Sequence, residues 1–408
     1  MQAVTMMLGI LVASITRSIQ ADGTAAILPE PSFCRALCLA ARKLGIGVYV
    51  FAPDSYQQHS GQLRAFFYES DRWIERLAPF PDIIYDRCFY TNAGQSSRCK
   101  NMLEALKHKK RYLMLNGQLP SKIDVHAVLK EDSRLSEYLP MTILYRAAEQ
   151  LEPLLSRYGN GIVLKPAAGM QGRGLLHMKR CPLEQSLHIR GRSRNNRAFS
   201  LTFTDERLFP RWLDRFINRS PYIVQPYLEL CAEDSRPFDA RALLQKNAKG
   251  SWNLTGIAIR SGQVGGLTSN LHGGGDAVPV KSQLIAKYGV QTAERLMEQI
   301  HTISKQAAET LESRFGRFAE LGFDFGIEPD GQLWLLEVNA KPGRSSFRLI
   351  GDRKAEQLSI AQPLHYARFL SMRAYPYLTA HESAYDRLRD VNIDNNRIRP
   401  FNVQEVHR

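Results

Sequence analysis

The stretch GFDFGIEPDGQLWLLEVNAKPG, residues Gly322–Gly343, carries the strongest structural signal in the chain. Apolar residues alternate on both sides of Asp330-Gly331, a dipeptide typical of a β-hairpin turn. If that dipeptide forms the loop, Asp324 lies directly opposite Glu337 on the neighbouring strand. Asn339 follows two residues later and projects from the same face. The pattern therefore predicts a hairpin that brings three oxygen-bearing side chains together.

Two facing carboxylates repel each other unless a cation lies between them. A divalent metal would supply that charge, because carboxylate and amide oxygens are hard ligands. An exposed face that tolerates the repulsion, or a bridging lysine or arginine, is the alternative interpretation. If the carboxylates do repel each other, neutralising either one should slightly stabilise the metal-free protein.

A glycine-rich loop is the second candidate element. In residues 161–175, GIVLKPAAGMQGRGL, an apolar strand ends at Lys165 and small residues follow. Glycines let backbone N–H groups close around phosphate oxygens, and a lysine adds positive charge. A plain flexible hairpin would have the same composition. The chain has no Gly-Lys pair, which excludes a Walker A phosphate loop.

A capping pattern, Ser121-Lys122-Ile123-Asp124, predicts a helix that continues through Leu129. Lys122 then lies in the first turn, where the helix dipole disfavours a cation. It is either a solvated lysine or one placed there to meet an anion.

A break in a buried strand marks another candidate binding element. Residues 222–230, YIVQPYLEL, read as a strand that Pro226 interrupts. Backbone groups of Gln225 and Tyr227 at such a break are free to bond a planar base, and Glu229 could reach a ribose. A strand edge without any ligand would look the same.

A further strand begins at residues 238–241, FDAR, whose aspartate and arginine share one face. Arg260 and the loop Ser269–Gly275, SNLHGGG, come next. Three consecutive glycines indicate a loop that approaches something closely. Asn270 either bonds that partner or caps a turn.

The first 115 residues have the pattern of an α/β domain. Apolar residues 6–12 predict a buried strand, and charged residues follow too soon for a membrane span. A helical repeat of apolar residues over 33–44 leads to a second strand at 48–51. Strand, helix and strand in this order predict a parallel βαβ unit, and 82–85 predicts a further strand.

The 408 residues have an ordinary globular composition, 44% hydrophobic and 23% charged, which excludes a disordered or collagen-like chain. The formal charge of +14 favours an anionic partner. Arginines and aromatics interleave over residues 190–219, which would suit nucleic acid, but a solvated, partly mobile insertion beside an anion site accounts for them equally well. The six cysteines have no regular spacing, so we expect reduced thiols.

Together these elements resemble the ATP-grasp superfamily, and within it most of all the YheC/YheD group of endospore coat-associated proteins. The resemblance spans about residues 115 to 345. The stretches I-Y-D-R at Ile84–Arg87 and N-A-K-P-G at Asn339–Gly343 favour the YheC/YheD group. Seven motifs occur in the family's order: Lys122, LPMT at Leu139–Thr142, the lysine and glycine loop of Lys165–Gly174, Q-P-Y at Gln225–Tyr227, F-D-A-R at Phe238–Arg241, S-N-L-H-G-G-G at Ser269–Gly275, and the D…E-V-N set of Asp324, Glu337 and Asn339.

The resemblance implies an α/β (α+β) ATP-grasp fold preceded by a Rossmann-like α/β domain, with ATP and one or two Mg²⁺ ions bound. The implied site has an ATP-binding part, a catalytic part and a metal-binding part. For ATP the residues are Lys122 and Lys165 at the phosphates, Gly169, Gly172 and Gly174 in a lid, Gln225 and Tyr227 at the adenine and Glu229 at the ribose; for catalysis they are Arg241, Arg260 and Asn270; for Mg²⁺ they are Asp324, Glu337 and Asn339.

The activity that the resemblance implies is that of an ATP-dependent carboxylate–amine ligase, or a related ligase, working through an acyl phosphate. The charge of the chain suggests an acidic or peptide-like acceptor, which a comparison of acidic and neutral peptides as ligands tests. A non-catalytic, nucleotide-binding scaffold of the spore coat is the alternative. Nucleic-acid binding ranks below both, and we expect no membrane partner.

The expected organisation has four segments. They are an N-terminal α/β domain over 1–115, a first ATP-grasp subdomain with the glycine lid over 116–222, a second subdomain with the metal site over 223–380, and a polar tail over 381–408. We expect a cytoplasmic, spore-associated protein without a secretion signal.

Overall fold

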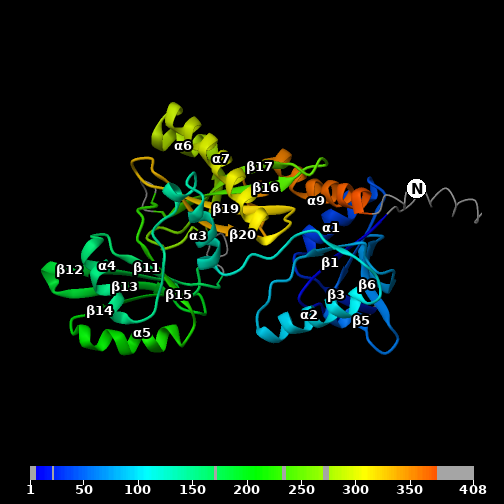
Figure 1. Cartoon of the computed structure of the whole chain (residues 1–408), viewed down its shortest axis with the longest axis horizontal. Coiled ribbons are helices and arrows are strands. Elements are labelled where there is room, and N and C mark those ends of the chain that lie inside the picture. The colour runs from blue at the N-terminus through cyan, green and yellow to red at the C-terminus, as the bar shows by residue number, and fades with distance from the viewer. Residues whose placement is uncertain (1–5, 21–22, 170–171, 232–235, 270–274, 375–408) are drawn as a thin grey trace, which may run out of the picture.

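Three large β-sheets, each in a lobe of its own, and a two-stranded sheet form the computed structural model (Figure 1). We call the large ones the N-terminal, middle and C-terminal sheets. Among the described residues no helix is long and apolar enough to cross a membrane. The structure describes residues 6–20, 23–169, 172–231, 236–269 and 275–374, so the predicted tail over 381–408 lies outside it.

The N-terminal sheet has seven strands in the order β5-β6-β4-β1-β8-β9, with β7 paired to β6. Strand β1 is parallel to both β4 and β8, which confirms the predicted βαβ unit. The elements are β1 Met6–Leu11, α1 Pro31–Arg42, β4 Ile46–Phe51, β5 Tyr56–Gln57, β6 Gln62–Glu69, β7 Arg72–Ala78, β8 Ile83–Asp86, α2 Ala93–Lys107 and β9 Leu113–Met114; a separate hairpin joins β2 Thr16–Gln20 to β3 Gly23–Ile27.

The middle sheet has six antiparallel strands in the order β10-β15-β11-β12-β13-β14. Helices α4 and α5 pack on one face, where Ile162 and Leu164 are buried. Val163 and Lys165 therefore point from the other face. The elements are β10 Ile143–Leu144, α4 Leu151–Arg157, β11 Ile162–Pro166, β12 Leu176–Cys181, β13 Ser186–Arg192, β14 Ala198–Phe203, α5 Phe209–Ile217 and β15 Tyr222–Pro226.

The arginine-rich segment over 190–219 is an ordered part of this sheet, formed by β14, α5 and the end of β13. Its aromatic rings pack on one another, with Trp212 and Phe216 stacked at 5.3 Å between ring centroids. Phe199 contacts both of these rings. The expectation of a partly mobile insertion was wrong, because these aromatics build the core under the sheet.

The C-terminal sheet has five antiparallel strands in the order β18-β17-β16-β19-β20. Helices α3 and α7 cover one face, and α8 and α9 pack on the other. Helix α9 also packs against α1, so it ties this sheet to the N-terminal lobe (Figure 1). The elements are α3 Lys122–Glu131, β16 Phe238–Lys246, β17 Trp252–Ser261, β18 Asp276–Pro279, α6 Val280–Tyr288, α7 Val290–Phe315, β19 Glu320–Ile327, β20 Leu333–Asn339, α8 Ser345–Leu349 and α9 Arg353–Ala374.

The remaining helices are single 3₁₀ turns in the connections between these elements. They are η1 Pro53–Ser55, η2 Ser136–Tyr138, η3 Ala148–Gln150, η4 Pro182–Glu184 and η5 Glu206–Leu208.

Candidate functional site

Strands β19 and β20 form the predicted hairpin, and Asp324 pairs with Glu337. The predicted two-residue loop was wrong, because the Glu328 N–H donates to the Gln332 carbonyl and closes a five-residue loop. Pro329 cannot donate into a strand ladder, which favours the longer loop. A bulge between Asp324 and Phe325 compensates for this difference and keeps the two carboxylates opposite each other.

The Asp324 carboxylate is neutralised by two arginines and does not face the Glu337 carboxylate alone. Arg241, its partner on β16, donates to both carboxylate oxygens, with Nη2 at 2.9 Å from Oδ2. Arg260 Nη2 lies 3.1 Å from Oδ1, and Asn339 Nδ2 lies 3.3 Å from Oδ2. Burial favours the neutral acid, but the two arginines outweigh it and lower the pKa of Asp324 to about 2.

This arrangement corrects the expectation that neutralising Asp324 would stabilise the protein. No repulsion remains to be relieved, since two guanidinium groups already balance the charge. The alternative interpretation, in which arginine or lysine side chains balance the carboxylates, therefore agrees with the ion pairs of Asp324 and Glu337 in the structure.

Arg260 is held from the other side by Asp239. Its Nε and Nη2 donate to the two Asp239 oxygens at 2.6 and 2.5 Å, and the Ser269 hydroxyl also donates to Asp239. Burial opposes the charge on Arg260, but the carboxylates of Asp239 and Asp324 outweigh it and raise its pKa. The predicted catalytic residues Arg241 and Arg260 thus lie side by side over Asp324. Asn270, the third, lies outside the described residues.

Lys122 begins α3, where the Ser121 side chain caps the helix through the Asp124 N–H at 3.4 Å, as predicted. The Lys122 ammonium lies 3.2 Å from a Glu337 oxygen. Of the two interpretations of Lys122, the structure therefore supports a lysine that meets an anion. The anion it meets is the second carboxylate of the hairpin.

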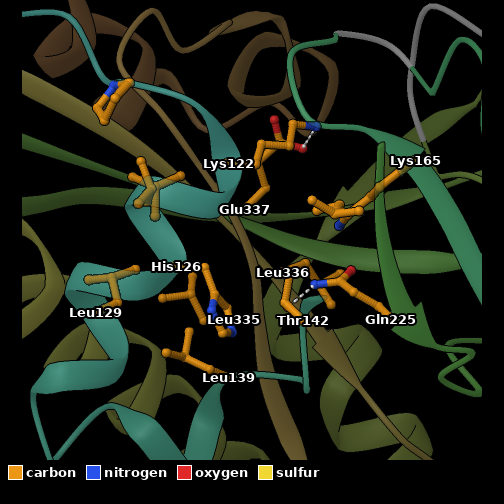
Figure 2. A pocket seen from close by; sticks show the side chains of 14 residues that line it. Lys122, His126, Leu129, Leu139, Thr142, Lys165, Gln225, Leu335, Leu336 and Glu337 are labelled. Carbon is orange, nitrogen blue, oxygen red and sulfur yellow. Dashed lines mark hydrogen bonds and ion pairs between the residues drawn. The ribbon is translucent and has the colours of Figure 1, made fainter. Parts of the chain in front are cut away.

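A cleft lies between β20, α3 and the face of the middle sheet that α4 and α5 leave uncovered. Figure 2 shows charged side chains at one end, where Lys122, Lys165 and Glu337 converge. Apolar side chains form the other end, among them Leu129 and Leu139. A cleft that is apolar at one end and cationic at the other suits a purine base with an attached polyphosphate.

Lys165, the last residue but one of β11, has its ammonium in the cleft (Figure 2). Burial, together with the charge of Lys122, lowers the pKa of Lys165 from its ordinary 10.5 to about 8, although Glu337 and Asp324 oppose the shift. The predicted glycine loop follows directly and joins β11 to β12. Gly174 has φ of +75°, and a side chain there would meet the Tyr222 hydroxyl at 2.7 Å. Gly172 is also left-handed, at φ of +70°, and Gly169 is described as well, whereas 170–171 are not.

The low pKa of Lys165 gives the site a pH dependence. Below about pH 8 the ammonium is charged and attracts a polyanion, and above it the neutral amine does not. We expect affinity for an ATP analogue to fall roughly tenfold between pH 7 and pH 9.5, the value of one charge-assisted hydrogen bond. Titration calorimetry at both pH values measures this. Lys165→Arg, which keeps its charge, should remove most of the fall, and a flat wild-type profile would contradict the assignment.

The three predicted base- and ribose-binding residues are not brought together. Gln225 lines the cleft, and its Nε2 donates to the Thr142 hydroxyl at 2.7 Å. Tyr227 does not line the cleft but stacks on His177, with 4.0 Å between ring centroids. Glu229 is exposed and accepts a hydrogen bond from Asn160 Nδ2 at 2.7 Å.

Two features of the site were missed by the sequence analysis. His126, on α3, lines the cleft and bonds the Pro140 carbonyl at 3.1 Å. Its place four residues after Lys122 on one helix face was the available signal. Leu336, the bulged residue of β20, also lines the cleft, and only the bulge accounts for it.

A third feature that the sequence analysis missed is a buried ionic cluster beyond the cleft, where the N-terminal and C-terminal lobes meet. Glu320, fully buried at the start of β19, lies 3.3 Å from Arg87 Nη1 and also contacts Arg344 Nη2. The Tyr85 hydroxyl and Gln245 Nε2 donate to the same carboxylate. Burial favours the neutral acid, but Arg344 and Arg87 outweigh it and lower the pKa of Glu320.

The donor set of the hairpin fits a hard divalent cation. Asp324, Glu337 and Asn339 place two carboxylates and an amide on one face of β19 and β20. Glu337 is only partly buried, and the ion pair that it forms with Lys122 among the described residues uses one of its two oxygens. Oxygen ligands of this kind are those that Mg²⁺ prefers.

Comparison with known proteins agrees with this geometry. The model of the YheC/D like ATP-grasp family matches residues 111–370. The endospore coat-associated protein YheC of Bacillus subtilis (strain 168) is 31% identical over 354 residues, which cover 84% of this chain and 93% of that protein. The endospore coat-associated protein YheD of the same strain is 26% identical over 336 residues, which cover 80% and 71%.

Among solved structures, D-cycloserine synthetase DcsG superposes with a TM-score of 0.51 at 12% identity, covering 89% of this chain and 99% of that one. That likeness concerns the fold alone, and it confirms the predicted mixed α and β ATP-grasp fold. Since the family model covers more than half of the residues and YheC exceeds 30% identity over most of both chains, the chain belongs to the YheC/D-like ATP-grasp family, as its motifs predicted.

Proposed function

We propose that this protein is an ATP- and Mg²⁺-dependent ligase that activates a carboxylate as an acyl phosphate and transfers the acyl group to an amine or a related nucleophile. The observation that carries the proposal is the junction of two features. The first is a cleft that is apolar at one end and has Lys122, Lys165 and Glu337 at the other. The second is Asp324, which lies opposite Glu337 and is paired with Arg241 and Arg260.

In this proposal the adenine lies among the apolar side chains, near Gln225. The triphosphate extends toward Lys122 and Lys165, under the loop of Gly169, Gly172 and Gly174. Each lysine would neutralise part of the phosphate charge, which is the main requirement of phosphoryl transfer. Tyr227 and Glu229 do not line the cleft, so in this proposal they would not contact the base. They would instead help to position the connection that follows β15.

The proposed chemistry has two steps. A substrate carboxylate oxygen attacks the γ-phosphorus, the bond to the bridging oxygen breaks, and ADP leaves. The nucleophile then attacks the acyl carbon, and inorganic phosphate leaves as the nucleophile loses a proton. Arg241 and Arg260 would stabilise charge in both steps, because their guanidinium groups are already aligned and need not reorganise.

Asp324, Glu337 and Asn339 would hold Mg²⁺. The ion would neutralise charge between the β- and γ-phosphates. The arginines that pair with Asp324 would then share its carboxylate with the metal. The arginines thus keep the Asp324 carboxylate charged and positioned before the nucleotide arrives.

The acceptor that we propose is acidic or peptide-like. On the cleft-side face of the middle sheet, His177 pairs with Arg190 and Lys179 pairs with His188, so basic side chains extend away from Lys165. The names of the two Bacillus relatives suggest that the reaction takes place in association with the spore coat. The same names support the alternative, a coat scaffold that binds nucleotide without turnover.

Calorimetric titration with a non-hydrolysable ATP analogue, with and without Mg²⁺, tests the site. We expect tight binding only with Mg²⁺, and a loss of at least tenfold in Glu337→Gln, because a metal ligand and the partner of Lys122 disappear together. Glu294→Gln, an exposed change of the same type on α7, is the matched control and should bind like the wild type.

Absence of binding by folded wild-type protein would overturn the nucleotide site itself. Binding that needs Mg²⁺ without any ATP hydrolysis, across acidic and neutral peptide acceptors, would instead favour the scaffold.

A further inference from the structure

The turn between β12 and β13 brings a thiol, an imidazole and a carboxylate together. Cys181 ends β12, Glu184 ends the 3₁₀ turn η4, and His188 lies in β13. Their ligand atoms all lie within 4.8 Å of one another. We propose that these three side chains form a binding site for a divalent transition metal of the zinc type, separate from the proposed Mg²⁺ site.

The strand register explains why the three side chains meet. His188 pairs with Lys179, and Cys181 follows Lys179 by two residues, so thiol and imidazole leave the sheet on the same face. Gln185, at φ of 45°, reverses the chain between the strands. Glu184 is thereby returned to that face, where its Oε2 lies 2.8 Å from His188 Nε2.

Second contacts orient the ligands. The Ser186 hydroxyl, on a buried residue, donates to Glu184 Oε2 at 3.2 Å and fixes the carboxylate beside the imidazole. Such outer contacts are typical of metal sites, where they hold ligating groups in position. A simple salt bridge between Glu184 and His188 would not involve Cys181. The thiol beside them is what distinguishes a metal-binding set from such a salt bridge.

The ligand chemistry selects the metal. Thiolate and imidazole are soft or borderline ligands that favour Zn²⁺ and related ions, whereas Mg²⁺ prefers oxygen. Zinc bonds are about 2.0–2.3 Å long, so its ligand atoms lie within about 4 Å of each other. Small rotations of the partly exposed Cys181 and His188 side chains bring the set to that geometry. Three protein ligands leave a fourth position open to water.

None of the three residues lines the cleft, so the site is separate from the proposed nucleotide and Mg²⁺ site. A bound ion would cross-link the ends of β12 and β13 at the tip of the middle sheet. That sheet also carries Lys165 and the glycine loop, so the ion would stiffen the lobe that holds them.

Cobalt titration of the full-length, reduced protein tests the proposal, because Co²⁺ replaces zinc and reports thiolate ligation through a near-ultraviolet charge-transfer band. We expect this band to saturate at one equivalent, to disappear on addition of Zn²⁺, and to persist in excess Mg²⁺. Cys181→Ser should abolish the band, and His188→Gln should weaken cobalt affinity at least tenfold.

Two controls make the result specific. Cys231→Ser removes the other partly exposed cysteine and should keep the band, and Glu337→Gln should keep it as well. Circular dichroism of the metal-free variants separates loss of metal from loss of fold, and His188→Gln carries the test if Cys181→Ser does not fold. A wild type without the band, or a band that survives in folded Cys181→Ser, would overturn the site.

Discussion

The Asp324→Asn protein should be about 3 kcal/mol less stable to unfolding than the wild type, the usual cost of removing one partner from a buried ion pair. Asparagine keeps the size of the side chain but leaves Arg241 and Arg260 without the carboxylate that they share. Arg260 retains Asp239, whereas Arg241 loses its ion pair. Urea unfolding followed by tryptophan fluorescence measures the loss.

The stability of Glu337→Gln should be measured beside that of Asp324→Asn, because the two variants differ in how deeply the lost carboxylate is buried. Its carboxylate and the Lys122 ammonium are both partly exposed, so their separation should cost less than about 1 kcal/mol. Both variants should lose Mg²⁺-dependent nucleotide binding, but only Asp324→Asn should lose stability. Equal stability of the two variants would mean that the ion pairs of Asp324 with the two arginines do not support the fold.

Glu320→Gln should loosen the junction between the N-terminal and C-terminal lobes by about 3–5 kcal/mol, since its fully buried carboxylate balances both Arg87 and Arg344. Hydrogen exchange should quicken in β8 and at the start of β19, and remain unchanged in the middle sheet. Glu30→Gln is the matched control. That carboxylate also pairs with Arg87, at 2.7 Å, but is partly exposed, so its loss should matter much less.

The Glu320 carboxylate also makes the stability of the junction depend on pH. Its pKa is lowered in the folded protein from the ordinary 4.5, so the stabilisation is complete above that value and disappears as the pH falls through the folded pKa. The wild type should therefore keep junction protection at pH 4.5 and lose it only at lower pH, and Glu320→Gln should lack this transition. Equal exchange rates in Glu320→Gln and Glu30→Gln would contradict the role of Glu320.

Local patterns were sufficient for the parts of the site that lie close in sequence. Alternation around Asp330 placed Asp324 opposite Glu337, and the cap at Ser121 placed Lys122 in a first helical turn. The pairing of Arg241 with Asp324 depends on which strand lies beside β19, and nothing in either segment specifies that neighbour. This is why two carboxylates predicted to repel are found neutralised.

The same limit applies to the fold. Helix α1 has a strongly one-sided apolar face and was predicted, whereas α2 has a weak one and was not. Strands β6 and β7 pair along their whole length, but their charged residues hide the alternation. The roles assigned to Gln225, Tyr227 and Glu229 remain predictions, because they concern a ligand and not a contact within the chain.

The bulge in β20 separates two properties that a regular hairpin would couple. Inserting or deleting one residue in a strand normally turns every later side chain to the opposite face. Here Leu336 is the residue without a partner in the ladder, so a chain that lacked it would still place Glu337 opposite Asp324. What it would lose is one apolar wall of the cleft. Loss of Leu336 would therefore reshape the apolar end of the cleft, while Asp324 and Glu337 would stay on the same face of the hairpin.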